Sequence, residues 1–198
     1  MQALTLWKII ANDYSNLFEN LIGLLKEQDI PFCLMGGQAV NVYAEPLISR
    51  ELNLVVAVGQ IDKVEVLFEK HFILKRFSHS LNVTIPDSDV RVQIQTDKRY
   101  GSFLERAVLR SVLGMTLPVA SVEDVLQGKI WAALDSARRG SKRQKDLADI
   151  ARILENYPQY RSLVPKEILE RLLDYISYSI KTKFCKRGSD NFLVCLIS

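Results

Sequence analysis

Cysteine and histidine are scarce in this sequence. Its 198 residues include three cysteines and two histidines, at no spacing typical of a metal site. The odd number of cysteines and their wide separation also argue against a disulfide framework. We therefore expect reduced thiols, with Cys33 packed as a small buried hydrophobe. Ordinary surface or core roles are expected for His71 and His79.

Long apolar runs and a large charge excess are also missing. No run approaches the roughly 20 apolar residues that a membrane-spanning helix needs. The sequence does not open with a basic segment followed by an apolar core, as a secretory leader would. We therefore expect a cytoplasmic protein that does not enter a membrane. A net charge of +3 does not by itself indicate a nucleic-acid binder.

Positive charge is nevertheless concentrated in one short segment. Residues 138–145 carry five cations, enough to attract phosphate groups. A solvated loop and helix start is the alternative interpretation of this segment.

The stretch from Phe32 to Val58 carries the clearest pattern. A short apolar run ends in Gly36 and Gly37, a helix-compatible segment follows, and a second apolar run closes the stretch. The two glycines permit a tight turn and let main-chain N–H groups approach an anion. A helix starting at Gln38 would direct its positive end to the same place. The pattern predicts a phosphate site at this turn.

Polar side chains open the second apolar run of this stretch. Glu51 and Asn53 are two residues apart, so on a strand they face the same way, about 7 Å apart. Leu52 and Leu54 then face the opposite layer. A later run behaves similarly, because Arg91, Gln93 and Gln95 alternate with apolar residues.

The polar face of that later run has two interpretations. If it borders the same cleft as Glu51, then Arg91, Gln93 and Gln95 are cleft residues. The alternative is the exposed polar face of an edge strand.

Hydrophobic periodicity and turn residues predict the other elements. We expect helices over residues 4–26, either as one helix or as two shorter ones divided at residues 12–15. Further helices are expected over residues 38–43, 61–72, 103–109, 122–134, 141–154 and 166–180. Strands are expected over residues 32–35, 52–58, 73–77, 80–85, 90–96 and 115–119. Residues 86–89 favour an antiparallel hairpin, and Ser121 is suited to cap the helix that follows it.

The order of these motifs resembles the nucleotidyltransferase superfamily, in particular its small bacterial AbiEii/AbiGii-toxin-like branch. The resemblance continues in SVEDVLQGKIWAAL and KRQKDLADIARIL, which are similar to the helical region of that family, and it covers roughly residues 20–157. It implies an α+β fold with a mixed β-sheet flanked by helices. We expect this core in residues 1–120, a C-terminal helical region in 121–180, and a tail in 181–198.

The resemblance also implies a set of site residues. Nucleotide binding is expected of Gly36, Gly37, Arg50, Lys129, Lys145 and Asp146. The catalytic positions are Glu51, Asn53 and Gln93, with Glu51 as the metal ligand. The implied cofactors are Mg²⁺ and a nucleoside triphosphate, and RNA or an antitoxin protein are further candidate partners, with an oligomer left open.

Two of these residues have simpler alternative interpretations. Lys129 could extend its side chain over Trp131. Asp146 could balance Lys142 and Arg143 as a surface ion pair, worth less than about 1 kcal/mol.

The sequence departs from the family at the metal site. The family has Asp-x-Asp where this chain has Glu51-Leu52-Asn53, and Gln93 or Gln95 stands where a third carboxylate is expected. A two-metal site needs several shared negative charges, and one glutamate supplies a single charge. We therefore predict a degenerate metal site in a protein that binds a nucleotide or acts as a non-catalytic module.

Two other functions remain open. One is an active metal-dependent nucleotidyltransferase of a toxin–antitoxin system that transfers NMP to RNA or protein. The other is a structural partner with a vestigial cleft.

Overall fold

The computed structural model describes residues 17–49 and 51–172. Several sequence predictions lie outside these residues. They are the first part of the helix over residues 4–26, the role of Arg50, the end of the helix over 166–180, and the tail 181–198.

A seven-stranded mixed sheet forms the centre of the fold, in the order β3-β4-β5-β2-β1-β7-β6. Its middle strand β2 pairs antiparallel with β1 and parallel with β5. This arrangement confirms the predicted mixed sheet and the antiparallel β4–β5 pair. The strands are β1 (Phe32–Met35), β2 (Glu51–Val56), β3 (Ile73–Phe77), β4 (Ser80–Thr84), β5 (Arg91–Gln95), β6 (Val108–Val112) and β7 (Met115–Val119).

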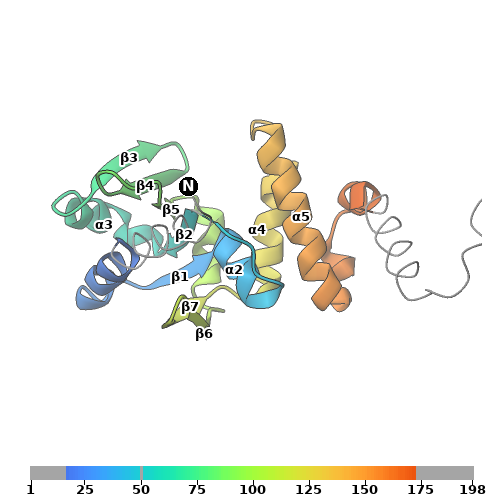
Figure 1. Cartoon of the computed structure of the whole chain (residues 1–198), viewed down its shortest axis with the longest axis horizontal. Coiled ribbons are helices and arrows are strands. Elements are labelled where there is room, and N and C mark those ends of the chain that lie inside the picture. Colours follow the sequence, from blue (N-terminus) through green and yellow to red (C-terminus); the bar gives the residue numbers. More distant parts are fainter. Residues whose placement is uncertain (1–16, 50, 173–198) are drawn as a thin grey trace, which may run out of the picture.

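Helices lie on both sides of the sheet (Figure 1). Residues 17–27 and α3 occupy one side, while α2 lies on the other side, next to α4 and α5. Among the described helices, none is both long enough and apolar enough to cross a membrane. The helices are α2 (Gly36–Tyr43), α3 (Ile61–Phe68), α4 (Val122–Leu134) and α5 (Gly140–Asn156), with 3-10 turns η1 (Val58–Gln60), η2 (Lys98–Phe103) and η3 (Pro158–Leu163). A further helix begins at residue 166.

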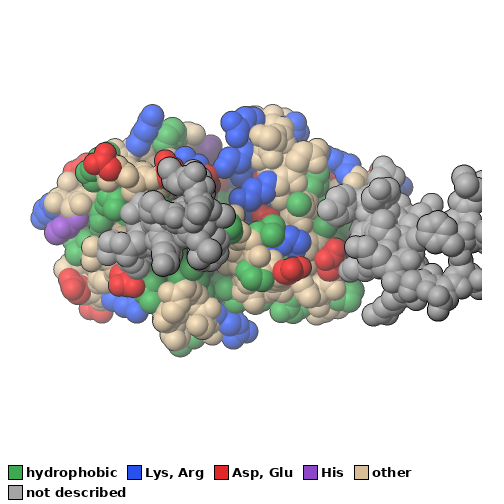
Figure 2. Space-filling view, viewed as in Figure 1, with side chains coloured by type: hydrophobic (Ala, Val, Ile, Leu, Met, Phe, Trp, Pro, Cys, Tyr) green, Lys and Arg blue, Asp and Glu red, His purple; other side chains and the backbone are tan. Residues whose placement is uncertain are grey.

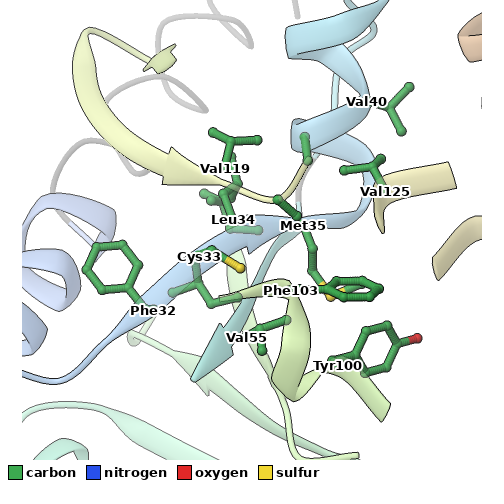
Figure 3. Packing of buried hydrophobic residues seen from close by; sticks show 14 of the residues in the cluster. Phe32, Cys33, Leu34, Met35, Val40, Val55, Tyr100, Phe103, Val119 and Val125 are labelled. Atoms are coloured by element: carbon green, nitrogen blue, oxygen red, sulfur yellow. The ribbon is translucent and has the colours of Figure 1, made fainter. Parts of the chain in front are cut away.

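The core follows the apolar runs of the sequence. Strand β1 is buried along its whole length, as expected for a strand covered on both faces (Figure 3). Leu52 and Leu54 of β2 are fully buried, which confirms their predicted direction. Burial, with a smaller effect from the charge of Asp124, raises the pKa of the Cys33 thiol to about 12. Cys33 is therefore an inert core residue, as predicted.

The helix predicted over residues 103–109 is wrong. This part of the chain instead ends the turn η2 and then forms β6. The rings of Tyr100 and Phe103 pack against Trp131 of α4, at 5.4 and 5.9 Å between ring centroids, and so hold the turn in place. Tertiary packing thus overrides the helical spacing.

The hairpin β6–β7 explains the rest of that segment. Its two-residue loop consists of Leu113 and Gly114, which both have positive φ angles. Positive φ at both loop residues is the geometry that joins antiparallel strands most tightly. Strand β6 is mostly exposed. Its sequence therefore lacks the regular alternation of apolar and polar residues that would have predicted this hairpin.

The turn between β1 and α2 depends on the absence of a side chain at Gly36. Gly36 has a φ of +69°, and a Cβ atom there would lie 2.7 Å from Nδ2 of Asn53 on β2. The turn therefore brings the start of α2 into close contact with the polar face of β2.

Substitution of Gly36 tests this close contact. We expect Gly36→Ala to lower the free energy of unfolding by about 2–4 kcal/mol, because it adds overpacking to left-handed backbone strain. Gly114→Ala is the matched control, since Gly114 has a φ of +83° but no atom within 4 Å of the added Cβ. Urea unfolding of both variants measures the difference, and equal losses would contradict the close contact.

Candidate functional site

A cleft of about 600 Å³ lies between the polar face of the sheet and the helices α4 and α5. Its size is within the range of small-molecule sites. The sheet side contributes the β1–α2 turn and the polar residues of β2 and β5, and the helix side contributes residues of α4 and α5. Figure 2 shows a notch in the surface, with Lys and Arg side chains gathered on its α4–α5 side.

The cleft brings together all the described residues that the sequence analysis selected. They are Gly36, Gly37, Glu51, Asn53, Gln93, Lys129, Lys145 and Asp146. Arg91 and Gln95 also line the cleft, so the edge-strand alternative for the polar face of β5 is wrong. The individual roles of these residues stay predictions.

Glu51 lies at the start of β2, directly opposite Arg91 in the parallel β2–β5 register. Hydrogen bonds between Ser49 Oγ and the main chain of Glu51 position this strand end. The Oε1 atom of Glu51 accepts hydrogen bonds from Arg91 Nη2 and from Lys142 Nζ, the latter at 2.8 Å. Glu51 of β2 therefore connects this strand to β5 and to the start of α5.

The charge of Glu51 is stabilised by these two partners. Burial acts to raise the pKa of Glu51, but the hydrogen bonds and positive charges of Lys142 and Arg91 outweigh burial. The pKa consequently lies below its ordinary value, and Glu51 is ionised at neutral pH.

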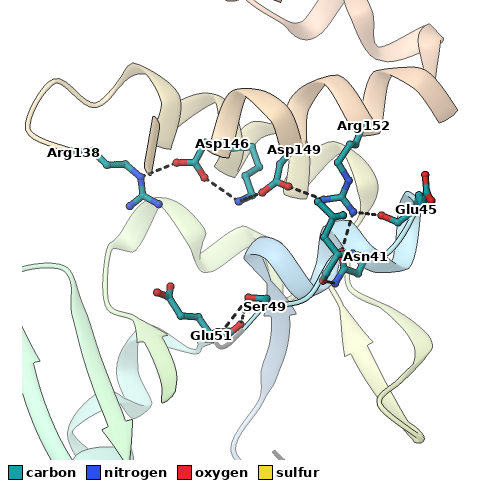
Figure 4. Close-up of polar contacts among 10 residues, drawn as sticks. Asn41, Glu45, Ser49, Glu51, Arg138, Asp146, Asp149 and Arg152 are labelled. Atoms are coloured by element: carbon teal, nitrogen blue, oxygen red, sulfur yellow. Dashed lines mark hydrogen bonds and ion pairs between the residues drawn. The ribbon is translucent and has the colours of Figure 1, made fainter. Parts of the chain in front are cut away.

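A second charge cluster joins α4 to α5. Lys129 Nζ lies 2.9 Å from Asp146 Oδ1 and 2.6 Å from Asp149 Oδ2. Arg138 binds the other oxygen of Asp146 at 2.7 Å, and Arg152 binds Oδ1 of Asp149 at 2.7 Å (Figure 4). Both aspartate side chains are 2% exposed, so each buried carboxylate is paired with two cations.

This cluster replaces both simpler interpretations of Lys129 and Asp146. The cation over the Trp131 ring is Arg99, at 5.1 Å from the ring centroid, rather than Lys129. Asp146 pairs with Lys129 and Arg138 rather than with Lys142 and Arg143. Lys129 is buried, and its charge is already matched by two carboxylates.

Positive charge is in excess across the cleft. Five cations and two carboxylates line it, and each carboxylate is paired with cations of the protein itself. Lys145 is an exposed cation of this lining. An anionic ligand therefore suits this cleft better than a cationic one.

The described residues do not fit a two-metal site. Within them, no group of three or more His, Cys, Asp or Glu side chains is arranged to hold a metal ion. On the sheet side of the cleft, Glu51 is the single carboxylate, and two cations contact it. Hard divalent cations require several anionic oxygens, and Arg91 and Lys142 would repel them.

Sequence reasoning missed the partners of Glu51 and of the two aspartates. Arg91 was singled out only as a residue of the polar strand face, and Lys142 only as part of the basic segment 138–145. In the sequence, Arg91 is 40 positions from Glu51, and Lys142 is 91 positions from it. No local pattern reports a contact of that separation.

Known proteins support the family resemblance and the fold. Residues 43–182, more than half of the chain, match the family described as "Nucleotidyl transferase AbiEii toxin, Type IV TA system". No curated protein matches the sequence.

Two solved structures resemble the chain at low sequence identity. The solution structure of the antibiotic-resistance factor ANT(2'')-Ia is 12% identical with a TM-score of 0.54, and the likeness covers 87% of this chain and 96% of that chain. An antigenic nucleotidyltransferase-like protein from Paracoccidioides brasiliensis is 16% identical with a TM-score of 0.51, covering 89% of this chain and 91% of that chain. These likenesses confirm the predicted nucleotidyltransferase-like α+β fold.

Removal of the Lys129 amine tests the buried cluster. We expect Lys129→Met to lower the free energy of unfolding by about 3–5 kcal/mol, because two buried carboxylates each lose a partner. The control is Lys145→Met, an exposed lysine of the same cleft, with an expected change within about 0.5 kcal/mol. Urea unfolding measures both variants. A loss at Lys129 no larger than at Lys145 would show that the cluster adds little stability.

Proposed function

The chain belongs to the AbiEii family of nucleotidyl transferases, and we propose that its cleft binds a nucleoside triphosphate while its metal site is degenerate. In this proposal the cations of the cleft and the backbone of the β1–α2 turn hold the triphosphate. The chain keeps the nucleotide site of the family and has lost two-metal transfer chemistry.

The observation that carries this proposal is the charge of the cleft. Its positive excess and its volume suit a polyphosphate ligand. The turn at Gly36 and Gly37 adds main-chain N–H groups at the start of α2, where the helix dipole favours an anion. Both features are independent of a bound metal.

The state of Glu51 supports the loss of two-metal chemistry. In a two-metal site, shared carboxylates hold ions about 3.5–4 Å apart. Here Glu51 is neutralised by Arg91 and Lys142, and its strand neighbours Asn53 and Gln93 are uncharged amides. The sheet therefore presents no surplus of negative charge to a divalent cation.

The family description favours a second candidate function. It names a nucleotidyl transferase toxin of a type IV toxin–antitoxin system. The second candidate is therefore an active transferase that moves NMP to RNA or protein and is controlled by an antitoxin protein. It requires a rearranged site in which Glu51 binds a metal ion instead of Arg91 and Lys142.

Nucleotide binding is tested by thermal unfolding with each of the four nucleoside triphosphates. We expect at least one of them to raise the melting temperature in EDTA as well as with Mg²⁺ or Mn²⁺. Ligand at 100 times its Kd adds about 2.7 kcal/mol, which is about 5–10 °C for a chain of this size.

Two lysine variants show whether that binding uses the cleft. Lys145→Ala should weaken binding about tenfold, the effect of one charge-assisted hydrogen bond. Lys70→Ala, an exposed lysine outside the cleft, should leave binding unchanged. The proposal fails if no nucleotide binds under any condition.

A transfer assay separates the two candidate functions. The purified protein is incubated with labelled nucleoside triphosphates, Mg²⁺ or Mn²⁺, and cellular RNA and protein. We expect no transfer of label, because the cleft lacks the carboxylates that two metals need. Metal-dependent labelling that Glu51→Ala abolishes would establish the active transferase instead.

A further inference from the structure

The strongest unexplained feature of the cleft is the convergence of two cations on one carboxylate oxygen. Arg91 comes from β5 and Lys142 from α5, and both donate to Oε1 of Glu51. The two cations thus approach a single point from opposite walls of the cleft. That point is occupied by an anionic oxygen of the protein.

We propose that Arg91 and Lys142 form a phosphate site, and that Glu51 is an internal counter-anion which a phosphate group of the nucleotide displaces. This inference rests on the proposed function and assigns Glu51 a role opposite to that of a metal ligand. A metal ligand would aid nucleotide binding, whereas a counter-anion competes with it.

The chemistry of the two cations suits phosphate. A guanidinium and an ammonium group directed at one oxygen are the donors that proteins use for phosphate recognition. The Nε atom of Arg91 is buried and has no hydrogen-bond partner in the described part of the chain. Arg91 therefore keeps an unused donor beside the one that binds Glu51, and a phosphate offers more acceptor oxygens than a carboxylate.

A ligand from solvent can reach these groups. The side chains of Arg91, Lys142 and Glu51 are 40%, 34% and 26% exposed. The Asp146 carboxylate, in contrast, is 2% exposed and is held by Lys129 and Arg138. Of the two carboxylates in the cleft, Glu51 is thus the one that an incoming anion can replace.

The test measures binding of ATP and of inorganic tripolyphosphate in EDTA by titration calorimetry. We expect Glu51→Gln to bind both about tenfold more tightly than the wild type, because the competing charge is gone. Glu69→Gln makes the same change in net charge on an exposed glutamate outside the cleft and should leave binding unchanged. Adding Lys142→Gln to Glu51→Gln should remove the gain.

Two results would overturn the inference. Unchanged affinity in Glu51→Gln would show that Glu51 does not compete with the anion. If Glu51→Gln binds ATP more weakly than the wild type, and the wild type binds ATP only with Mg²⁺, then Glu51 holds a metal. If Glu51→Gln does not fold, Lys142→Gln in the wild-type background must still weaken tripolyphosphate binding, and unchanged binding overturns the inference.

The two ligands distinguish this inference from the proposed function. Tighter tripolyphosphate binding by Glu51→Gln without any ATP binding would support the phosphate site and reject the nucleotide. ATP binding by the wild type with no gain in Glu51→Gln would keep the proposed function and reject the counter-anion.

Discussion

The geometry of the cleft depends on the buried charges between α4 and α5. A carboxylate that is removed from water is stable only when cations or hydrogen-bond donors surround it. Asp146 and Asp149 meet this requirement by sharing Lys129, and each adds an arginine of its own. These contacts fix α5 against α4 in one register, because a shift of one residue would turn the aspartates away from the lysine.

The same cluster sets where the cleft wall lies relative to the sheet. Arg152, which pairs with Asp149, also donates hydrogen bonds to the Asn41 side chain of α2 and to the main-chain carbonyl of Glu45 (Figure 4). Helix α2 begins at the Gly36 turn, which packs against Asn53 of β2. The path from Lys129 to β2 is therefore a continuous set of polar and close backbone contacts, and it places Lys142 within reach of Glu51.

Much of this arrangement could be predicted from local sequence signals. The β1–turn–α2 unit follows from an apolar run and two glycines, and the polar face of β5 follows from strict alternation. Helix α4 was predicted with its observed bounds, because Ser121 is a residue that favours a helix start. In the structure, Ser121 Oγ accepts a hydrogen bond from the Asp124 N–H, as a helix cap should. The helix over residues 103–109 was predicted wrongly, because Tyr100 and Phe103 pack against Trp131 on a distant helix. The partners of Glu51 were missed for the same physical reason.

The charges of Arg91 and Lys142 also account for a single carboxylate at position 51 with amides beside it. Asn53 and Gln93 are paired across the β2–β5 register and face the cleft beside Glu51. A carboxylate at either position would add a second negative charge to the face of the sheet that carries Glu51, and Arg91 and Lys142 would then have to balance two charges instead of one. A single glutamate satisfies both cations, and its side chain is long enough to meet Lys142 from the opposite wall. An amide at position 53 also packs on Gly36 without adding charge to the turn. The ion pairs of Glu51 with Arg91 and Lys142 thus match one negative charge of the protein with two cations, which is the balance on which the proposed exchange of one anion for another rests.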